Sequence, residues 1–88
     1  MKELKVTIID PVGIHARPAG AIVQETKKLD SEVEIYANNK KVSAKNILGI
    51  LSLGVRCNQE MTFTFKGGSE QKSLEAIQKV LKANKLTK

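Results

Sequence analysis

The residues of this 88-residue chain that could do chemistry gather at positions 13–19, which read Gly-Ile-His-Ala-Arg-Pro-Ala and contain the only histidine. A neutral imidazole has a nitrogen lone pair that can attack an electrophile, which makes His15 a candidate nucleophile. The guanidinium of Arg17 offers planar, charge-assisted donors to phosphate or carboxylate oxygens. The alternatives are a packed or merely exposed histidine and a solvated arginine, which are the commoner roles of these residue types.

His15 lies where a strand pattern gives way to a helix pattern. Residues 4–9 are largely an alternation of apolar and polar side chains, which predicts a strand with one buried face. Asp10-Pro11 ends the strand, because proline has no N–H for the sheet ladder. From position 16 onward apolar residues recur at helical spacing, so we expect a helix over about residues 16–28.

An anion site is expected at the start of this helix. His15 would be the N-cap or its neighbour, and histidine is not a strong capping residue, so the amides of Ala16 and Arg17 should lack a side-chain acceptor. Free amides at the positive end of a helix dipole attract anions. Pro18 has no N–H, which confines this opening to the two residues before it.

The electrostatics of the helix start also act on the imidazole. The helix dipole and Arg17 disfavour protonation of His15, which keeps its lone pair available. A phosphoryl group accepted by His15 would bring negative charge to the free amides and to Arg17. A ring that is neutral before transfer and stabilised after it is what a reversible phosphoryl acceptor requires, and these residues predict that function.

Several other chemistries are disfavoured by what the sequence lacks. It has one histidine, one cysteine (Cys57) and no spacing typical of metal ligands, so we expect neither a metal nor a cofactor. It also has no Gly-rich loop for a nucleotide and no paired acid and base. Cys57 is interpreted as a bystander. The donor and acceptor of any transferred group must therefore come from partner proteins, and the chain is not expected to be an enzyme in its own right.

Composition limits the remaining classes of function. The net charge of +6 suggests either nucleic acid or acidic protein partners, but aromatic side chains do not interleave with the basic ones. We therefore expect steering of acidic proteins and no nucleic-acid binding. There is no run of eighteen apolar residues and no apolar signal peptide, so membrane insertion is not expected. A single cysteine fits a reducing compartment, and we expect a cytoplasmic monomer.

The rest of the chain predicts the elements that must hold this site. Strand patterns cover residues 33–37, 41–43 and 61–66, and the asparagines between the first two suit a tight hairpin turn. A last helix begins after Ser69, which can cap it, and the tail from Leu86 is expected to fray. The order β-α-β-β-α-β-α predicts an α+β fold. We expect an open-faced two-layer β-sandwich, with a four-stranded, mostly antiparallel sheet covered on one face by three helices, as a single domain over residues 1–88.

A short apolar segment at residues 47–53 has two faces that one sheet cannot bury together. Asn46 is a good N-cap and Gly54 a good residue after the end, so a helix of about two turns is favoured over a strand. On a helical wheel one side carries Ile47, Leu48 and Leu51, and a separate side carries Ile50 and Leu53. Either one side is exposed as a binding surface or both are buried under loops, and the pattern alone favours neither.

Two segments of the chain resemble signatures of a known family. Residues 13–19 resemble the active-site signature of HPr, the histidine-containing phosphocarrier proteins of the bacterial phosphoenolpyruvate:sugar phosphotransferase system. Residues 46–54, Asn-Ile-Leu-Gly-Ile-Leu-Ser-Leu-Gly, resemble the family's second signature around its short helix. The resemblance covers essentially the whole chain, and the two motifs at this spacing are strongly specific.

The resemblance implies a mechanism and partners. His15 would be phosphorylated on Nδ1 by Enzyme I, which takes the phosphoryl group from phosphoenolpyruvate, and would pass it to the IIA domains of sugar permeases. Arg17 matches the family's phosphate-assisting arginine. The resemblance also implies that the side of the short helix with Ile47, Leu48 and Leu51 is exposed as a binding surface. The implied partner-binding surface comprises Ile47, Leu48, Leu51, Arg17, Gly20, Gln24 and Lys27.

One position departs from the family pattern. Many relatives carry a serine where this chain has Asn46, and an ATP-dependent HPr kinase phosphorylates that serine for carbon catabolite control. Asparagine can cap the helix but cannot be phosphorylated, so serine-type regulation is not expected here. An alternative is an HPr-like regulatory module that docks on a transcription factor or enzyme, but regulatory relatives often lack the active-site histidine that His15 matches.

Overall fold

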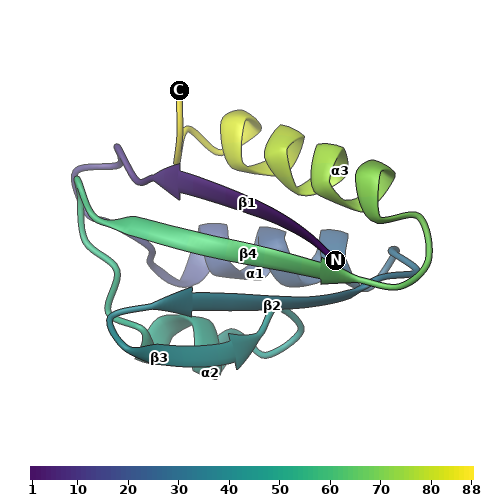
Figure 1. Cartoon of the computed structure of the whole chain (residues 1–88). Coiled ribbons are helices and arrows are strands. Elements are labelled where there is room, and N and C mark those ends of the chain that lie inside the picture. The colour runs from purple at the N-terminus through teal and green to yellow at the C-terminus, as the bar shows by residue number, and fades with distance from the viewer.

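The computed structural model describes residues 1–88 and contains four strands and three helices. The strands pair in the order β1-β4-β2-β3, and every pair is antiparallel. The helices cover one face of this sheet and leave the other open (Figure 1), which confirms the predicted fold. The elements in chain order are β1 (Lys2–Thr7), α1 (Ala16–Thr26), β2 (Glu32–Ala37), β3 (Lys40–Ser43), α2 (Ile47–Ser52), β4 (Glu60–Lys66) and α3 (Glu70–Ala83).

The alternation of side chains along the strands builds the core. Phe63 of β4 lies opposite Leu4 of β1 and Ile35 of β2, and Ile35 lies opposite Val42 of β3. This row crosses the whole sheet on the face that the helices cover, and Phe63 and Ile35 are fully buried. Residues one step along each strand, such as Tyr36, point to the open face.

Helix α1 buries the face that the sequence pattern predicted and ends slightly earlier than expected. Ile22, Val23 and Thr26 are buried, and the hydroxyl of Thr26 donates to the Ile22 carbonyl at 2.7 Å. The helix ends at Thr26, and Lys27 is its C-cap. The N–H of Lys28 donates to the Glu25 carbonyl, three residues back, and no longer to a carbonyl four residues back. No helix in the structure is both long and apolar enough to cross a membrane.

The β2–β3 hairpin holds the short helix α2 in place. Asn38 and Asn39 both have positive φ, as expected for a tight hairpin turn. The side chain of Asn38 also donates to the Leu53 carbonyl at 2.8 Å, so the hairpin tip is bonded to the end of α2. At the other end of α2 the side chain of Asn46 accepts the N–H of Gly49 at 3.0 Å, which confirms the predicted cap.

The start of α3 differs from expectation. Ser69 is the N-cap residue by position, but its hydroxyl makes no capping bond. It donates instead to the carboxylate of Asp30 at 3.2 Å, and the backbone N–H of Ser69 donates to the same carboxylate at 2.9 Å. The prediction of a serine cap was therefore wrong, because a carboxylate distant in sequence competes for the hydroxyl.

The predicted fraying of the C-terminal tail was also wrong. Leu86 is fully buried in the core, and its N–H donates to the Leu81 carbonyl at 2.9 Å across a left-handed Lys85. This pattern is a Schellman motif, in which an apolar residue after the helix packs back against it. The carbonyl of Leu86 accepts the N–H of Ile9 at 2.8 Å, so the tail is bonded to the segment just after β1.

Candidate functional site

His15 is the N-cap of α1, as its position in the sequence predicted. Its backbone is extended (φ −112°, ψ −176°), and its carbonyl accepts the N–H of Ala19 at 3.1 Å, the first bond of the helix. Its side chain makes no capping bond. The imidazole is 36% exposed, so a reacting group on another molecule can reach it.

The first turn of α1 leaves two amides without a partner in the chain. No hydrogen bond of a loop, cap or side chain uses the N–H of Ala16 or Arg17. Pro18 follows with no N–H and a buried ring. No acidic residue lies in this turn. The positive end of the helix is therefore open to an anion brought by another molecule.

Asp10 is a site residue that the sequence analysis did not identify. Its Oδ2 lies 3.9 Å from Nε2 of His15, within ion-pair range but beyond a hydrogen bond. Its Oδ1 accepts the backbone N–H of Val12 at 2.8 Å, a side-chain turn common for aspartate. An aspartate at the end of a strand, five residues before the histidine, was the available signal, but it was interpreted only as a strand stop.

The loop between Asp10 and His15 is braced by the segment that follows α2. Gly13 has φ +83°, and a Cβ there would collide with the Val55 carbonyl, so only glycine fits. The N–H of Ile14 donates to the same carbonyl at 3.1 Å. Helices α1 and α2 also pack against each other. The fold thereby joins the two sequence motifs into one region.

The predicted partner residues of α1 form one stripe, in which Gly20 is half-buried and the other three residues are exposed. Arg17, Gly20, Gln24 and Lys27 recur at three- and four-residue intervals, which places them on one helix side. Arg17 has no ion pair or side-chain hydrogen bond within the chain. A Cβ on Gly20 would meet nothing within 4 Å, so the chain's own packing does not require a glycine there.

The exposed side of α2 is narrower than the helical wheel suggested. Leu48 is 78% exposed and Ile47 is 39% exposed, whereas Ile50 is buried. Leu51, expected on the exposed side, is half-buried and packs against the core. Helix α2 packs against α1 and β3, so part of the side that the wheel left free is covered. Ile47 and Leu48 form the exposed apolar patch of α2.

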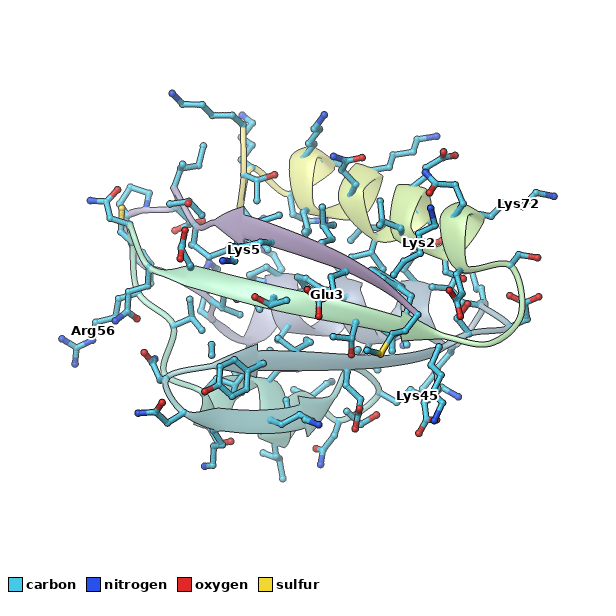
Figure 2. The ribbon with its side chains drawn as sticks, viewed as in Figure 1. Lys2, Glu3, Lys5, Lys45, Arg56 and Lys72 are labelled. Carbon is cyan, nitrogen blue, oxygen red and sulfur yellow. The ribbon has the colours of Figure 1, made fainter.

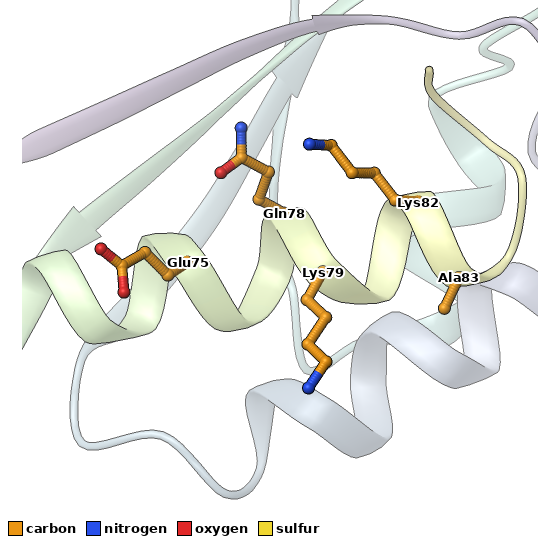
Figure 3. Close-up of a pocket in the computed structure, with 5 residues that line it drawn as sticks. All are labelled: Glu75, Gln78, Lys79, Lys82 and Ala83. Atoms are coloured by element: carbon orange, nitrogen blue, oxygen red, sulfur yellow. The ribbon is translucent and has the colours of Figure 1, made fainter.

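The surface hollows, and several of the exposed cations, lie away from His15. Figure 3 shows the hollow formed along α3 by Glu75, Gln78, Lys79, Lys82 and Ala83, none of which belongs to the predicted site. His15 and Arg17 line no hollow at all. In Figure 2 the cations of Lys5, Lys45, Arg56 and Lys72 project from separate parts of the molecule. The predicted site residues therefore lie outside the hollows of the surface.

The structure brings together no group of three or more histidine, cysteine, aspartate or glutamate side chains that could hold a metal. The sulfur of Cys57 lies 3.6 Å from the Ile9 carbonyl and is half-buried. Neither observation adds a chemistry beyond that of the imidazole and its neighbours.

An open-faced sandwich with an accessible histidine at a helix N-terminus fits a carrier of a chemical group. The family model described as "PTS HPr component phosphorylation site" matches residues 2–83. The chain belongs to the HPr family, the phosphocarrier proteins of the phosphotransferase system, and is a carrier and not an enzyme. The resemblance drawn from the two motifs is confirmed.

Individual relatives agree over the full length. The phosphocarrier protein HPr of Mycoplasma genitalium is 39% identical over 87 residues, covering 98% of this chain and 99% of that protein. A histidine-containing phosphocarrier protein, described in relation to the divergence of Mycoplasma from Gram-positive bacteria, superposes with a TM-score of 0.95 at 28% identity, over 99% of both chains. An HPr dimer from Thermoanaerobacter tengcongensis gives a TM-score of 0.73 at 36% identity, covering 96% of this chain and 97% of that one.

Proposed function

We propose that this protein accepts a phosphoryl group on Nδ1 of His15 from phosphorylated Enzyme I and donates it to the IIA domains of sugar permeases. The observation that carries the proposal is the N-cap position of His15, beside two unpartnered amides and an unpaired Arg17. The names of the relatives support the carrier role over a regulatory docking module.

The chemistry needs no cofactor from this chain. The Nδ1 lone pair of His15 forms a bond to phosphorus while the bond between phosphorus and the donor atom breaks, and its electron pair stays with the donor. The phosphoryl oxygens then lie near the amides of Ala16 and Arg17 and the Arg17 guanidinium, which stabilise their charge. Transfer to the next protein is the reverse step with a different acceptor.

Docking is assigned to the exposed patch of α2 and the stripe on α1. Ile47 and Leu48 supply apolar area beside the site, and exposed apolar side chains of this size commonly mark a binding surface. Arg17, Gln24 and Lys27 would meet acidic or polar groups of a partner. A carrier must leave each partner, so we expect weak, rapidly exchanging complexes.

The proposal includes that the protein acts as a monomer in the cytoplasm. No part of the site described above needs a second copy of the chain. Three similar structures are described as dimers, so sedimentation of this protein at working concentration is the direct check.

The deciding experiment is phosphorylation by Enzyme I with labelled phosphoenolpyruvate and Mg²⁺. The wild-type chain should gain one acid-labile phosphoryl group, mapped to His15. His15→Ala should gain none and should unfold at a similar temperature, because the side chain makes no capping bond. Labelling of His15→Ala to the wild-type extent would contradict the proposal.

A second experiment tests the docking surface. Leu48→Glu places a charge on the most exposed residue of the patch and should lower the rate of transfer from Enzyme I by more than about 10-fold, with little change in stability. Tyr36→Glu, which adds the same charge on the open face of the sheet, is the matched control and should leave the rate unchanged. Equal losses in both variants would show that added charge, not the patch, is responsible.

A further inference from the structure

We propose that Asp10 is a positioning residue for phosphoryl transfer, because its carboxylate faces Nε2 of His15, holds the ring proton there and leaves the Nδ1 lone pair free. The inference rests on the proposed function and adds to it the group that selects between the two ring nitrogens. In a neutral histidine, the groups that face the two ring nitrogens decide which nitrogen carries the proton. A carboxylate beside one nitrogen favours the proton on that nitrogen.

Asp10 is held in place from both sides. Its Oδ1 is fixed by the N–H of Val12 at 2.8 Å, and its backbone carbonyl accepts the N–H of Gly13 at 2.9 Å. Pro11 restricts the backbone between these bonds. The side chain is only 17% exposed. With Oδ1 occupied, the oxygen that remains for another group is Oδ2, which is the one that faces the ring.

No other carboxylate in the structure lies within ion-pair distance of the imidazole. The cation closest in sequence is Arg17, which is exposed and unpaired, and the dipole of α1 adds positive potential at the helix start. At 3.9 Å Asp10 acts through its charge or through one bridging water, and the pair can shorten when the ring gains positive charge. The carboxylate therefore favours the tautomer with N–H at Nε2.

This tautomer serves transfer in both directions. When Nδ1 bonds to phosphorus, a ring that keeps its proton on Nε2 becomes positively charged, and the Asp10 carboxylate offsets that charge. When the P–N bond breaks again, its electron pair returns to the ring, which leaves as neutral imidazole because Nε2 is still protonated. Without that proton the leaving group would be an imidazolate anion, which is a far poorer one.

Asp10→Asn tests the inference with almost no change in shape. The asparagine Oδ1 can still accept the N–H of Val12, which turns its NH₂ group toward Nε2 of His15. A donor at that place favours the opposite tautomer, with the proton on Nδ1, the atom that must attack. An aspartate-to-asparagine change beside a catalytic histidine is known to act in this way in serine proteases.

The first measurement uses the unphosphorylated protein and needs no partner. ¹⁵N–¹H spectra of the His15 ring, at a pH where the imidazole is neutral, should show Nε2–H in the wild type and a shift toward Nδ1–H in Asp10→Asn. Glu3→Gln, which removes an exposed charge from the open face of the sheet (Figure 2), should leave the wild-type tautomer. A wild-type tautomer in Asp10→Asn would overturn the inference.

The second measurement is the rate of phosphorylation by Enzyme I. Asp10→Asn should be slowed by about 10-fold or more, with an unfolding temperature close to that of the wild type. Glu3→Gln should keep the wild-type rate. A wild-type rate in Asp10→Asn would also overturn the inference. Failure of the wild-type chain to be labelled would instead remove the proposed function, and the spectra would still decide whether Asp10 sets the tautomer.

Discussion

The N-termini of α1 and α3 solve the same electrostatic problem in opposite ways. At α3 the chain supplies two anions of its own: Asp30 accepts the backbone N–H of Ser69, and Glu70 accepts the N–H of Gly67 at 2.7 Å. At α1 there is no acidic residue in the first turn, and Arg17 occupies it instead. The α3 terminus carries carboxylates of this chain, whereas the first turn of α1 carries none and is open to an anion from outside.

The hydrogen bonds at the start of α3 lower the pKa values of both carboxylates. The backbone N–H of Ser69 is the main cause that lowers the pKa of Asp30, and the N–H of Gly67 does the same for the pKa of Glu70, assisted by the N-terminal amino group. The Asp10 carboxylate near α1 is directed to Val12 and to the imidazole, not to the helix amides. The contrast indicates that the negative charge at the start of α3 comes from this chain, whereas the start of α1 is left for the charge of another molecule.

Capping α1 with a side chain, as Asn46 caps α2, should give the largest effect. His15→Asn puts a strong capping residue on an extended N-cap, where its side chain can accept the N–H of Arg17. We expect stability to rise by about 1 kcal/mol, a change of about 4–8 °C in Tm for a domain of this size, while phosphorylation is lost completely. Thermal unfolding and mass analysis after incubation with Enzyme I measure both.

His15→Ala is the reference, since it loses phosphorylation without gaining a cap. If His15→Asn were no more stable than His15→Ala, the amides of Ala16 and Arg17 would not be the open donors that the comparison describes.

Acid should weaken the hydrogen bonds that Asp30 and Glu70 accept at the start of α3. Asp30 and Glu70 have folded pKa values below their ordinary values of 3.8 and 4.5, so on acidification the unfolded chain takes up protons first. Their stabilising contribution is therefore full above about pH 4.5 and is lost as the pH falls through the folded pKa values. Urea unfolding at neutral pH and at about pH 3 should show a smaller acid-induced loss in Asp30→Asn than in the wild type.

Glu3→Gln is the control, because that exposed carboxylate makes no hydrogen bond or ion pair in the chain. If acid lowered the free energy of unfolding of Asp30→Asn as much as that of the wild type, the bonds of Asp30 would not stabilise the start of α3.

The smallest expected effect is on the salt dependence of association. Arg17 and Lys27 would steer acidic partners toward α1, so raising salt should lower the second-order rate of transfer several-fold, mainly through association. Lys27→Gln should flatten that dependence. Lys72→Gln, at the α3 end of the molecule (Figure 2), should not. A rate that is the same at low and high salt would contradict electrostatic steering.

The features that sequence reasoning predicted are those that follow local rules. The positions of His15 at the start of α1 and of Asn46 at the start of α2 come from capping preferences and apolar spacing over a few residues. The exposure of Leu48 could not be predicted from these rules alone, because the helical wheel left two alternatives open. The family resemblance decided between them. The half-buried position of Leu51 depends on the contacts of α2 with α1 and β3, which no periodicity encodes.

The features that were missed depend on contacts between distant segments or on side-chain direction. Ser69 lost its capping role to Asp30, 39 residues earlier in the chain. Asp10 looked like a strand stop, and only its side-chain geometry shows that one oxygen is occupied by Val12 and the other faces the histidine. Such placements follow from the assembled fold and not from any window of sequence.

The burial of Leu86 connects the residue that follows α3 to the loop that carries the histidine. Its side chain lies in the core, and its carbonyl accepts the N–H of Ile9, the residue immediately before Asp10. Truncating that side chain, as in Leu86→Ala, would leave a cavity in the core next to the bond to Ile9. A substitution far from His15 in the sequence would thus act on the segment that positions Asp10.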